Sequence, residues 1–190
     1  MRCGVVLYSQ LNGQFVCAIL SLNKTRASEW DSLFRCSRFV AAVFFLRKGR
    51  DMYYLKTSAC FDSAHFLHGY NGKCANIHGH HWVVEVKISG GKLQENGEKR
   101  GMLLDFGDFK KAVKDLAEGF DHTFIYEKNT LKPTTLAALQ EEGFSLVETD
   151  FRPTAENFAA HIYADLCNKG LPVFSVAVYE SPENCAVYGE

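Results

Sequence analysis

Alternating apolar and polar side chains predict two strands near the middle of the chain. The first covers residues 53–65, and the second, opened by His78 and His80, reaches residue 88. One parity of each strand is largely apolar and is expected to face the core: Leu55 and Phe61 on the first, Trp82, Val84, Val86 and Ile88 on the second. A loop rich in Gly and Asn separates the two strands, which predicts an antiparallel hairpin.

Apolar residues at helical spacing predict two main helices downstream. The first follows Asp105, a good N-cap, and Gly119 ends it. The second follows Thr154 as its cap and ends near Gly170. Their core-facing stripes recur every three or four residues: Phe109, Val113 and Leu116 in the first, Phe158, Ile162 and Leu166 in the second.

Shorter segments complete the predicted order. Residues 101–106 favour a short strand, 134–142 a short helix, 172–180 a strand and 186–188 an edge strand. With the hairpin and the main helices, the order becomes ββααββ. We therefore expect an α+β domain, with an antiparallel four-stranded sheet and two main helices on one face.

Composition narrows the class of protein. The 190 residues, 47% hydrophobic and 23% charged, suit a globular domain with a real core. A net charge of −1 gives no electrostatic footprint for nucleic acid. No apolar run approaches the roughly 20 residues that cross a bilayer. Seven cysteines without regular spacing argue against a secreted disulfide framework, so we expect reduced thiols and a cytoplasmic location.

Residues 1–51 differ from the rest in charge. They carry a net charge of +5, and the other 139 residues carry −6. The apolar run 39–46 is short and too far from the N-terminus for a signal peptide. We expect 1–51 to be an appendage, which a start assigned too far upstream would explain, and 52–190 to be the domain. A native extension packed on the domain is the alternative, and a targeting peptide is less favoured.

Three histidines are candidate metal ligands. His78 and His80 lie two residues apart on a predicted strand, so their imidazoles point to the same face. His65 closes the preceding strand, and the hairpin brings it to the same end. Three imidazoles at one point are the protein ligands of an open catalytic zinc site. Three unrelated structural histidines are the alternative. His81 has the opposite parity and is not expected to bind the metal.

Cys74 and the Asp121-His122 pair are candidates for proton transfer. Cys74 lies four residues before His78 and is a candidate base or nucleophile beside a metal. It could instead be a small buried residue, or a fourth zinc ligand that closes the site. In the pair, the carboxylate would orient the histidine and raise its basicity. An ordinary loop hydrogen bond is the alternative for the pair.

Glu180 and Glu156 are candidate ligand-binding carboxylates. Glu180 ends an apolar strand, where a carboxylate is costly unless it is paired. A planar ligand with two adjacent N–H groups would pair it, and so would an internal Lys or Arg. Glu156 could contact a ligand, but stabilisation of the first helical turn explains it more simply.

Six motifs in order resemble the family of 6-pyruvoyl- and 6-carboxy-tetrahydropterin synthases, from about residue 52 to 188. They are Phe-Asp-Ser-Ala-His at 61–65, Cys-x3-His-Gly-His at 74–80, Leu-Asp-Phe at 104–106, Asp-His at 121–122, Pro-Thr-Ala-Glu-Asn at 153–157, and Glu180 followed by Tyr188. The three residues between the cysteine and His-Gly-His are similar to the queuosine-pathway 6-carboxy type, because the pyruvoyl type has a longer spacing. Residues 1–51 match nothing in the family.

The resemblance implies a tunnelling fold. In it, the sheets of three copies join into a barrel, and two trimers stack into a homohexamer with active sites at subunit interfaces. It implies that 7,8-dihydroneopterin triphosphate is converted into 6-carboxy-5,6,7,8-tetrahydropterin, acetaldehyde and triphosphate. The implied roles are Zn²⁺ ligation by His65, His78 and His80, proton transfer by Cys74, His122 and Asp121, and pterin binding by Glu180, helped by Thr154 and Glu156.

Two other functions are the alternatives. A pyruvoyl-forming synthase would eliminate triphosphate without releasing acetaldehyde. A catalytically silent module would bind zinc or a pterin without turnover.

Overall fold

The computed structural model describes residues 3–11, 14–22 and 51–189, and the chain divides into two units, 1–50 and 51–190. In the first unit, β1 (Cys3–Leu11) pairs antiparallel with β2 (Gln14–Leu22), a hairpin that the sequence patterns did not predict. That residues 1–51 are an appendage stays a prediction. Residues 23–50, with the apolar run considered above, lie outside the described part.

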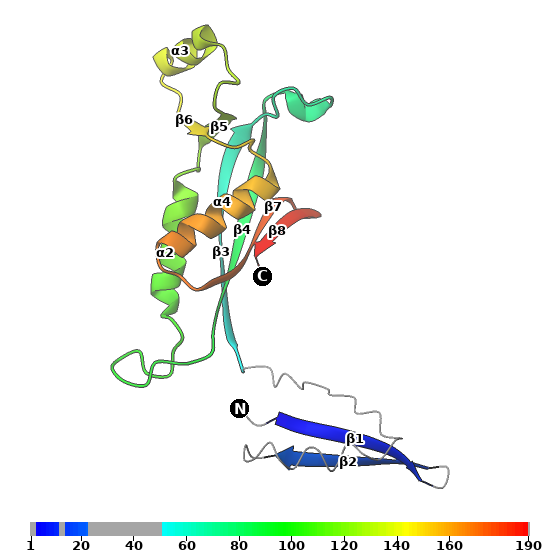
Figure 1. Cartoon of the computed structure of the whole chain (residues 1–190). Coiled ribbons are helices and arrows are strands. Elements are labelled where there is room, and N and C mark those ends of the chain that lie inside the picture. Colours follow the sequence, from blue (N-terminus) through cyan, green and yellow to red (C-terminus); the bar gives the residue numbers. More distant parts are fainter. Residues whose placement is uncertain (1–2, 12–13, 23–50, 190) are drawn as a thin grey trace. The chain divides into compact units, whose positions relative to one another are not determined.

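The second unit is built on a six-stranded sheet with the order β6-β5-β3-β4-β7-β8 (Figure 1). Its strands are β3 (Tyr53–His65), β4 (His78–Gly90), β5 (Thr123–Glu127), β6 (Leu146–Thr149), β7 (Val173–Ser181) and β8 (Asn184–Gly189). The pairs β3–β4, β4–β7 and β7–β8 are antiparallel, whereas β5 runs parallel to both β3 and β6. The sheet is therefore mixed.

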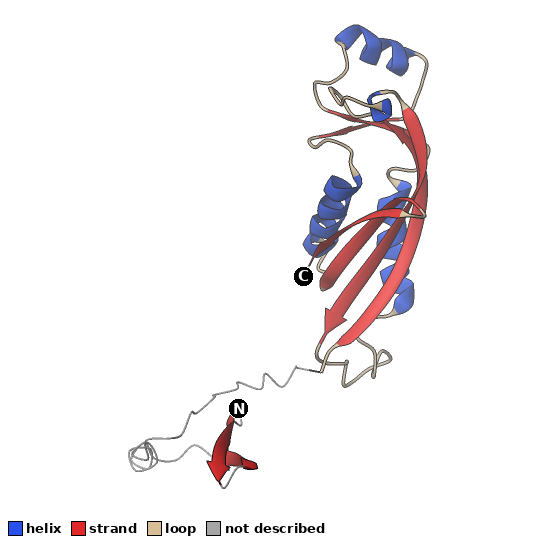
Figure 2. Cartoon of the chain, turned by 90° about the vertical axis from the view of Figure 1, so that its right-hand side faces the viewer, coloured by secondary structure: helices blue, strands red, loops and turns tan. Residues whose placement is uncertain are grey.

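The β3–β4 hairpin is the central element of this sheet, and its long strands bend along their length (Figure 2). Its register sets Phe61 against Trp82 and His65 against His78. The short 3₁₀ helix η2 (Lys73–Ala75) lies in the connection between the strands. Because side chains alternate along a strand, Phe61 and Trp82 share the buried face, where neither is more than 1% exposed.

Two helices, α2 (Phe106–Glu118) and α4 (Ala155–Asn168), pack on that buried face. Asp105 caps α2 and Thr154 caps α4, each accepting hydrogen bonds from main-chain N–H groups of the first turn, as the sequence predicted. Within the described ranges, no helix combines the length and the apolar composition that crossing a bilayer demands.

Aromatic rings fill the core up to the histidine end of the hairpin. Trp82 packs against Phe61 and Phe158, with ring centroids 6.0 and 5.1 Å away, and these two rings also contact each other. The ring of His65 meets Trp82 edge-on at 5.1 Å. Aromatic packing of this kind adds to the stability gained from burial alone. The histidines of the hairpin are therefore packed against buried aromatic rings.

The predicted fold class is right in being α+β, with two main helices in one core, but wrong about the sheet. The sheet has six strands rather than four, and it is mixed rather than antiparallel. The two missed strands, β5 and β6, contain five and four residues, too few for alternation to identify them. Between them lies a third helix, α3 (Pro133–Glu141), in the long connection that a parallel pair requires.

The predicted strand at 101–106 is also wrong. Gly101 has a φ of 85°, in the left-handed region that favours glycine, and the segment forms turns that lead to Asp105. The apolar residues Leu103 and Leu104 pack on the core from these turns rather than from a strand.

Candidate metal centre and a separate Asp-His pair

Three histidines gather where the β3–β4 hairpin ends. His65 is the last residue of β3, His78 faces it as the first residue of β4, and His80 follows two residues later on the same face. The ring centroids of His65 and His78 are 4.5 Å apart, and His80 lies 5.2 Å from His65 and 4.9 Å from His78. The structure thus brings together all three of the predicted metal ligands.

The Nε2 atoms of these histidines are buried and have no hydrogen-bond partner. Buried polar atoms are nearly always paired, so three orphans in one cluster call for a missing partner such as an ion. One nitrogen from each histidine and a carboxylate oxygen of Glu180 all lie within 4.8 Å of one another. This group could hold a metal ion.

The opposite ring nitrogens fix how two of these imidazoles point. His65 Nδ1 lies 2.7 Å from the carbonyl oxygen of Pro153, and His78 Nδ1 lies 2.8 Å from that of Asn76. A carbonyl only accepts, so each Nδ1 carries the proton and each Nε2 presents its lone pair to the cluster. Metal-ligating histidines are usually supported by outer partners of this kind.

Burial favours the neutral form of two of the three histidines, His65 and His80. Desolvation lowers the pKa of His65 to about 4. The hydrogen bond to Pro153 acts in the opposite direction, and the neighbouring His78 and His80 add to the lowering. Desolvation also lowers the pKa of His80, against the opposing charge of Glu180. Neutral imidazoles are the form that binds a metal.

Glu180, near the end of β7, lies inside this cluster. Its Oε1 atom is 3.1 Å from His80 Nε2 and 3.6 Å from His65 Nε2, although neither contact has hydrogen-bond geometry. Three imidazoles suit zinc, and a carboxylate as fourth ligand would close a tetrahedral site. A carboxylate that instead binds a ligand would leave that position open. The donor set therefore fits a divalent metal in either arrangement.

Cys74 lies in η2, at the same end of the hairpin as the histidines. It is a free, partly buried cysteine, and its carbonyl oxygen accepts a hydrogen bond from Leu67 N at 2.8 Å. This bond joins the beginning and the end of the connection between β3 and β4. The role of the thiol stays a prediction.

The Asp121-His122 pair lies on the other face of the hairpin. Its hydrogen bonds go to the main chain of Asp62, and His122 lines a hollow with the side chains of Asp62 and His81, which alternate with buried residues of their strands and therefore face away from the helices. His122 is 81% exposed in its side chain. Within one chain, the structure does not place the pair in the histidine cluster.

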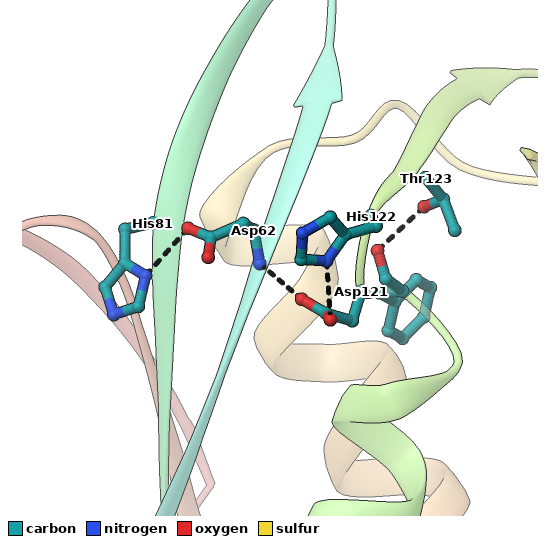
Figure 3. Close-up of polar contacts among 6 residues, drawn as sticks. Asp62, His81, Asp121, His122 and Thr123 are labelled. Carbon is teal, nitrogen blue, oxygen red and sulfur yellow. Dashed lines mark hydrogen bonds and ion pairs between the residues drawn. The ribbon is translucent and has the colours of Figure 1, made fainter.

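Hydrogen bonds hold the pair in a defined shape (Figure 3). Asp121 accepts a 2.7 Å hydrogen bond from His122 Nδ1 with one carboxylate oxygen and a 2.8 Å bond from Asp62 N with the other. The hydrogen bond and the charge of Asp121 raise the pKa of His122. The bond from Asp62 N, followed by that from His122, lowers the pKa of Asp121. The arrangement is that of a carboxylate orienting an imidazolium.

Sequence reasoning passed over a second carboxylate and imidazole on this face. Asp62 Oδ1 accepts a 2.8 Å hydrogen bond from His81 Nδ1 (Figure 3). The two are directly opposite in the β3–β4 register, so their shared outward parity was the available signal. Together with His122 they line a hollow of about 460 Å³, to which His80 also contributes.

Thr154 and Glu156 begin α4, next to the cluster through the carbonyl of Pro153. Thr154 accepts a 3.4 Å hydrogen bond from Asn157 N, and Glu156 is an exposed acidic residue of the first turn. Both therefore stabilise the helix start. A part in pterin binding stays a prediction for each.

The fold and the cluster define a class: an α+β domain with a candidate metal centre at the end of a central hairpin. The family model described as 6-pyruvoyl tetrahydropterin synthase matches residues 54–190. The chain belongs to this family and is an enzyme.

Two relatives are named 6-carboxy-5,6,7,8-tetrahydropterin synthase. The one from Haemophilus influenzae is 35% identical over 142 residues, which cover 73% of this chain and 100% of the relative. The one from Rickettsia felis is 32% identical over 133 residues, covering 67% of this chain and 92% of the relative.

Solved structures support the fold. An uncharacterized protein of Wolinella succinogenes superposes with a TM-score of 0.60 at 21% identity, covering 74% of this chain and 99% of its own. The 6-pyruvoyl tetrahydropterin synthase of Caenorhabditis elegans gives a TM-score of 0.52 at 22% identity, covering 74% and 96%. At these identities the likeness concerns architecture alone.

Proposed function

We propose that the chain catalyses the zinc-dependent conversion of 7,8-dihydroneopterin triphosphate and water into 6-carboxy-5,6,7,8-tetrahydropterin, acetaldehyde and triphosphate, in the cytoplasm and for queuosine biosynthesis. The observation that carries this proposal is the cluster of three buried, unpartnered Nε2 atoms. It lies in a chain 35% identical, over a relative's whole length, to a 6-carboxy-tetrahydropterin synthase.

In this proposal His65, His78 and His80 hold the zinc. When bound, zinc supplies Lewis acidity that acidifies the hydroxyl groups of the pterin side chain. The carbonyl groups of Pro153 and Asn76 keep the ligand nitrogens pointing inward. The buried ring of Trp82, which packs against His65, excludes water from the protein side of the site.

Proton transfer is assigned to Cys74 and the Asp121-His122 pair. Cys74 accepts a proton from the carbon skeleton, and His122, oriented by Asp121, acts as the partnering acid and base. The raised pKa of His122 supports this role, because it favours the imidazolium form that donates a proton.

Glu180 is the proposed pterin anchor. A carboxylate accepts two parallel hydrogen bonds from the amino and ring N–H groups of a pterin. Its position beside the histidines supports a pterin bound next to the zinc. Thr154 and Glu156 would assist from the start of α4, adjacent to Pro153.

A second copy of the chain is part of the proposal. Because Asp121 and His122 lie on the face opposite the histidine cluster, the pair that completes one site would come from another copy. Among the described residues, β3 pairs with β5 only at 63–65, and the main chain of Asp62 is bound to Asp121 and His122, so the edge at 53–61 is free to pair with another chain. We propose a homohexamer built as a dimer of trimers.

The choice of product distinguishes the alternatives. A pyruvoyl-forming synthase would use the same substrate and release triphosphate without acetaldehyde. A non-catalytic module would bind zinc or pterin without turnover. The three-residue spacing between Cys74 and His78, together with the names of the relatives, favours the carboxy product.

Product analysis tests the proposal. The zinc-loaded full chain is incubated with 7,8-dihydroneopterin triphosphate, and the pterins, acetaldehyde and triphosphate are quantified. We expect equal amounts of 6-carboxy-tetrahydropterin, acetaldehyde and triphosphate, formed at least about a hundredfold more slowly by Cys74→Ala under the same conditions. Triphosphate without acetaldehyde would establish the pyruvoyl reaction instead, and pterin binding without any product would leave the silent module.

A further inference from the structure

Asp62 touches both members of the Asp121-His122 pair through its main chain. Its N–H donates to Asp121 Oδ1 at 2.8 Å, and its carbonyl accepts from His122 N at 2.7 Å. The pair is thus attached at two points to one residue of β3, rather than to its own loop alone; Figure 3 shows the bond from Asp62 N to Asp121. The position of Asp62 on β3 therefore fixes the position of the pair.

These contacts hold an unusual backbone conformation. His122 has a φ of 53°, in the left-handed region that is uncommon for residues other than glycine. Strained residues of this kind persist where surrounding contacts determine them, and they concentrate at functional sites. The hydrogen bond from His122 N to Asp62 is the contact made by the strained residue's own main chain.

The side chain of Asp62 adds a charge to the same place. It is held toward the hollow by His81, whose Nδ1 lies 2.8 Å from Asp62 Oδ1. The charged groups that face His122 are Asp121 from its own loop, Asp62 from β3 and Glu118 from α2, with His81 on β4 beyond Asp62. All three carboxylates act on His122 in the same direction, and Asp121 has the largest effect.

We propose that Asp62 is a positioning residue for the Asp121-His122 pair: its main chain fixes the place of the pair, and its carboxylate, oriented by His81, favours the imidazolium form of His122. The catalytic consequence rests on the proposed function. The electrostatic claim concerns the folded chain alone and can be measured without turnover.

An NMR titration of the imidazole of His122 tests the electrostatic claim. Asp62→Asn keeps the size and the main-chain contacts but removes the charge, so the pKa of His122 should fall. Asp62→Glu should restore it, and Glu118→Gln, which removes the more weakly acting carboxylate, should lower it less. An unchanged pKa in Asp62→Asn, or an equal fall in Glu118→Gln, would overturn the inference.

The pH dependence of kcat/KM tests the catalytic consequence. Because a larger share of His122 is neutral in Asp62→Asn, kcat/KM should fall about two- to fivefold above the pKa of His122, as expected for one exposed charge pair, and recover at lower pH. In Asp62→Glu, kcat/KM should return to the value of the unsubstituted enzyme at every pH. A loss independent of pH would contradict the inference, since it indicates a merely structural role. An inactive unsubstituted enzyme in which the pKa of His122 still follows Asp62 would refute the proposed reaction and leave the positioning role standing.

Discussion

The histidine cluster and the Asp121-His122 pair lie on opposite faces of the β3–β4 hairpin. Their surroundings shift the pKa values of their histidines in opposite directions. Burial lowers the pKa of His65 to about 4, whereas the hydrogen bond and charge of Asp121 raise the pKa of the exposed His122. An imidazole kept neutral presents a lone pair to a metal, and one kept protonated can donate a proton. The same side chain is thus prepared for two tasks by its environment.

The largest effect should come from removing a ligand on the buried face. His78→Ala deletes one of the three converging Nε2 atoms at a partly exposed position, so the fold should survive. Losing an outer partner of a ligating histidine already costs roughly 10–100-fold in affinity or activity. Losing the ligand itself should cost more than about 100-fold in turnover. Elemental analysis should find the metal content falling from one per chain to almost none.

His81→Ala is the matched control for this substitution. It removes a neighbouring imidazole of the same strand that points to the other face. The variant should keep its full metal content. If His81→Ala lost the metal, or His78→Ala kept it, the separation of the two faces would be wrong.

A second prediction tests whether the two faces meet between copies. Cys74→Ala and His122→Gln should each lower turnover by about 10²–10⁴-fold, the usual contribution of acid–base catalysis. When the two variants are dissociated together and reassembled, about a quarter of the sites would combine an intact thiol with an intact imidazole from another copy. Activity should then return to roughly that fraction of the unsubstituted enzyme.

Cys60→Ala mixed with His122→Gln is the control, because Cys60 is an exposed cysteine of β3 on the outward face. Cys60→Ala should be fully active by itself, and the mixture should show only the activity of its own intact sites. If the Cys74→Ala and His122→Gln mixture stayed inactive although mass spectrometry detected mixed assemblies, the two groups would not share a site.

The third prediction concerns stability and pH in the metal-free protein. The pKa of His65 is about 4 in the folded chain against its ordinary value of 6.5, so the unfolded chain binds more protons between these values. The free energy of unfolding should therefore fall as pH drops from 6.5 to 4. The loss is at most about 3.5 kcal/mol, because each pKa unit corresponds to about 1.4 kcal/mol.

Denaturant unfolding at a series of pH values measures this slope. His65→Gln should flatten it. His122 should behave oppositely, since its pKa is raised. Its stabilisation is present below its ordinary pKa and is lost as pH rises through the folded value. A slope unchanged in His65→Gln would mean that other groups dominate acid destabilisation.

The sequence predicts the buried face of this chain better than the exposed one. Parity and spacing bring out His65, His78 and His80, since all three follow from a single long hairpin. The caps at Asp105 and Thr154 are equally local and are confirmed. Local periodicity is enough wherever one strand or helix positions the residue.

What the sequence did not predict depends on contacts between distant segments. Strands β5 and β6 are short and pair in parallel, so neither alternation nor a tight turn identifies them. As a result, nothing in the pattern indicated that His122, the residue before β5, binds the main chain of Asp62. The place of Glu180 among the histidines likewise requires the register of β7 on β4.

The smallest expected effect concerns Glu180, the only acidic residue in the cluster that the described residues form. Glu180→Gln keeps the shape of the side chain but removes the charge that a pterin's two N–H groups would pair with. A charge-assisted hydrogen bond replaced by a neutral one should raise KM about tenfold. Metal content should stay unchanged, since three imidazoles suffice for an open zinc site. Glu183→Gln, an exposed carboxylate in the following turn, should alter neither quantity. If Glu180→Gln lost its metal instead, Glu180 would be a fourth ligand, and the buried face would carry a closed site rather than a reactive one.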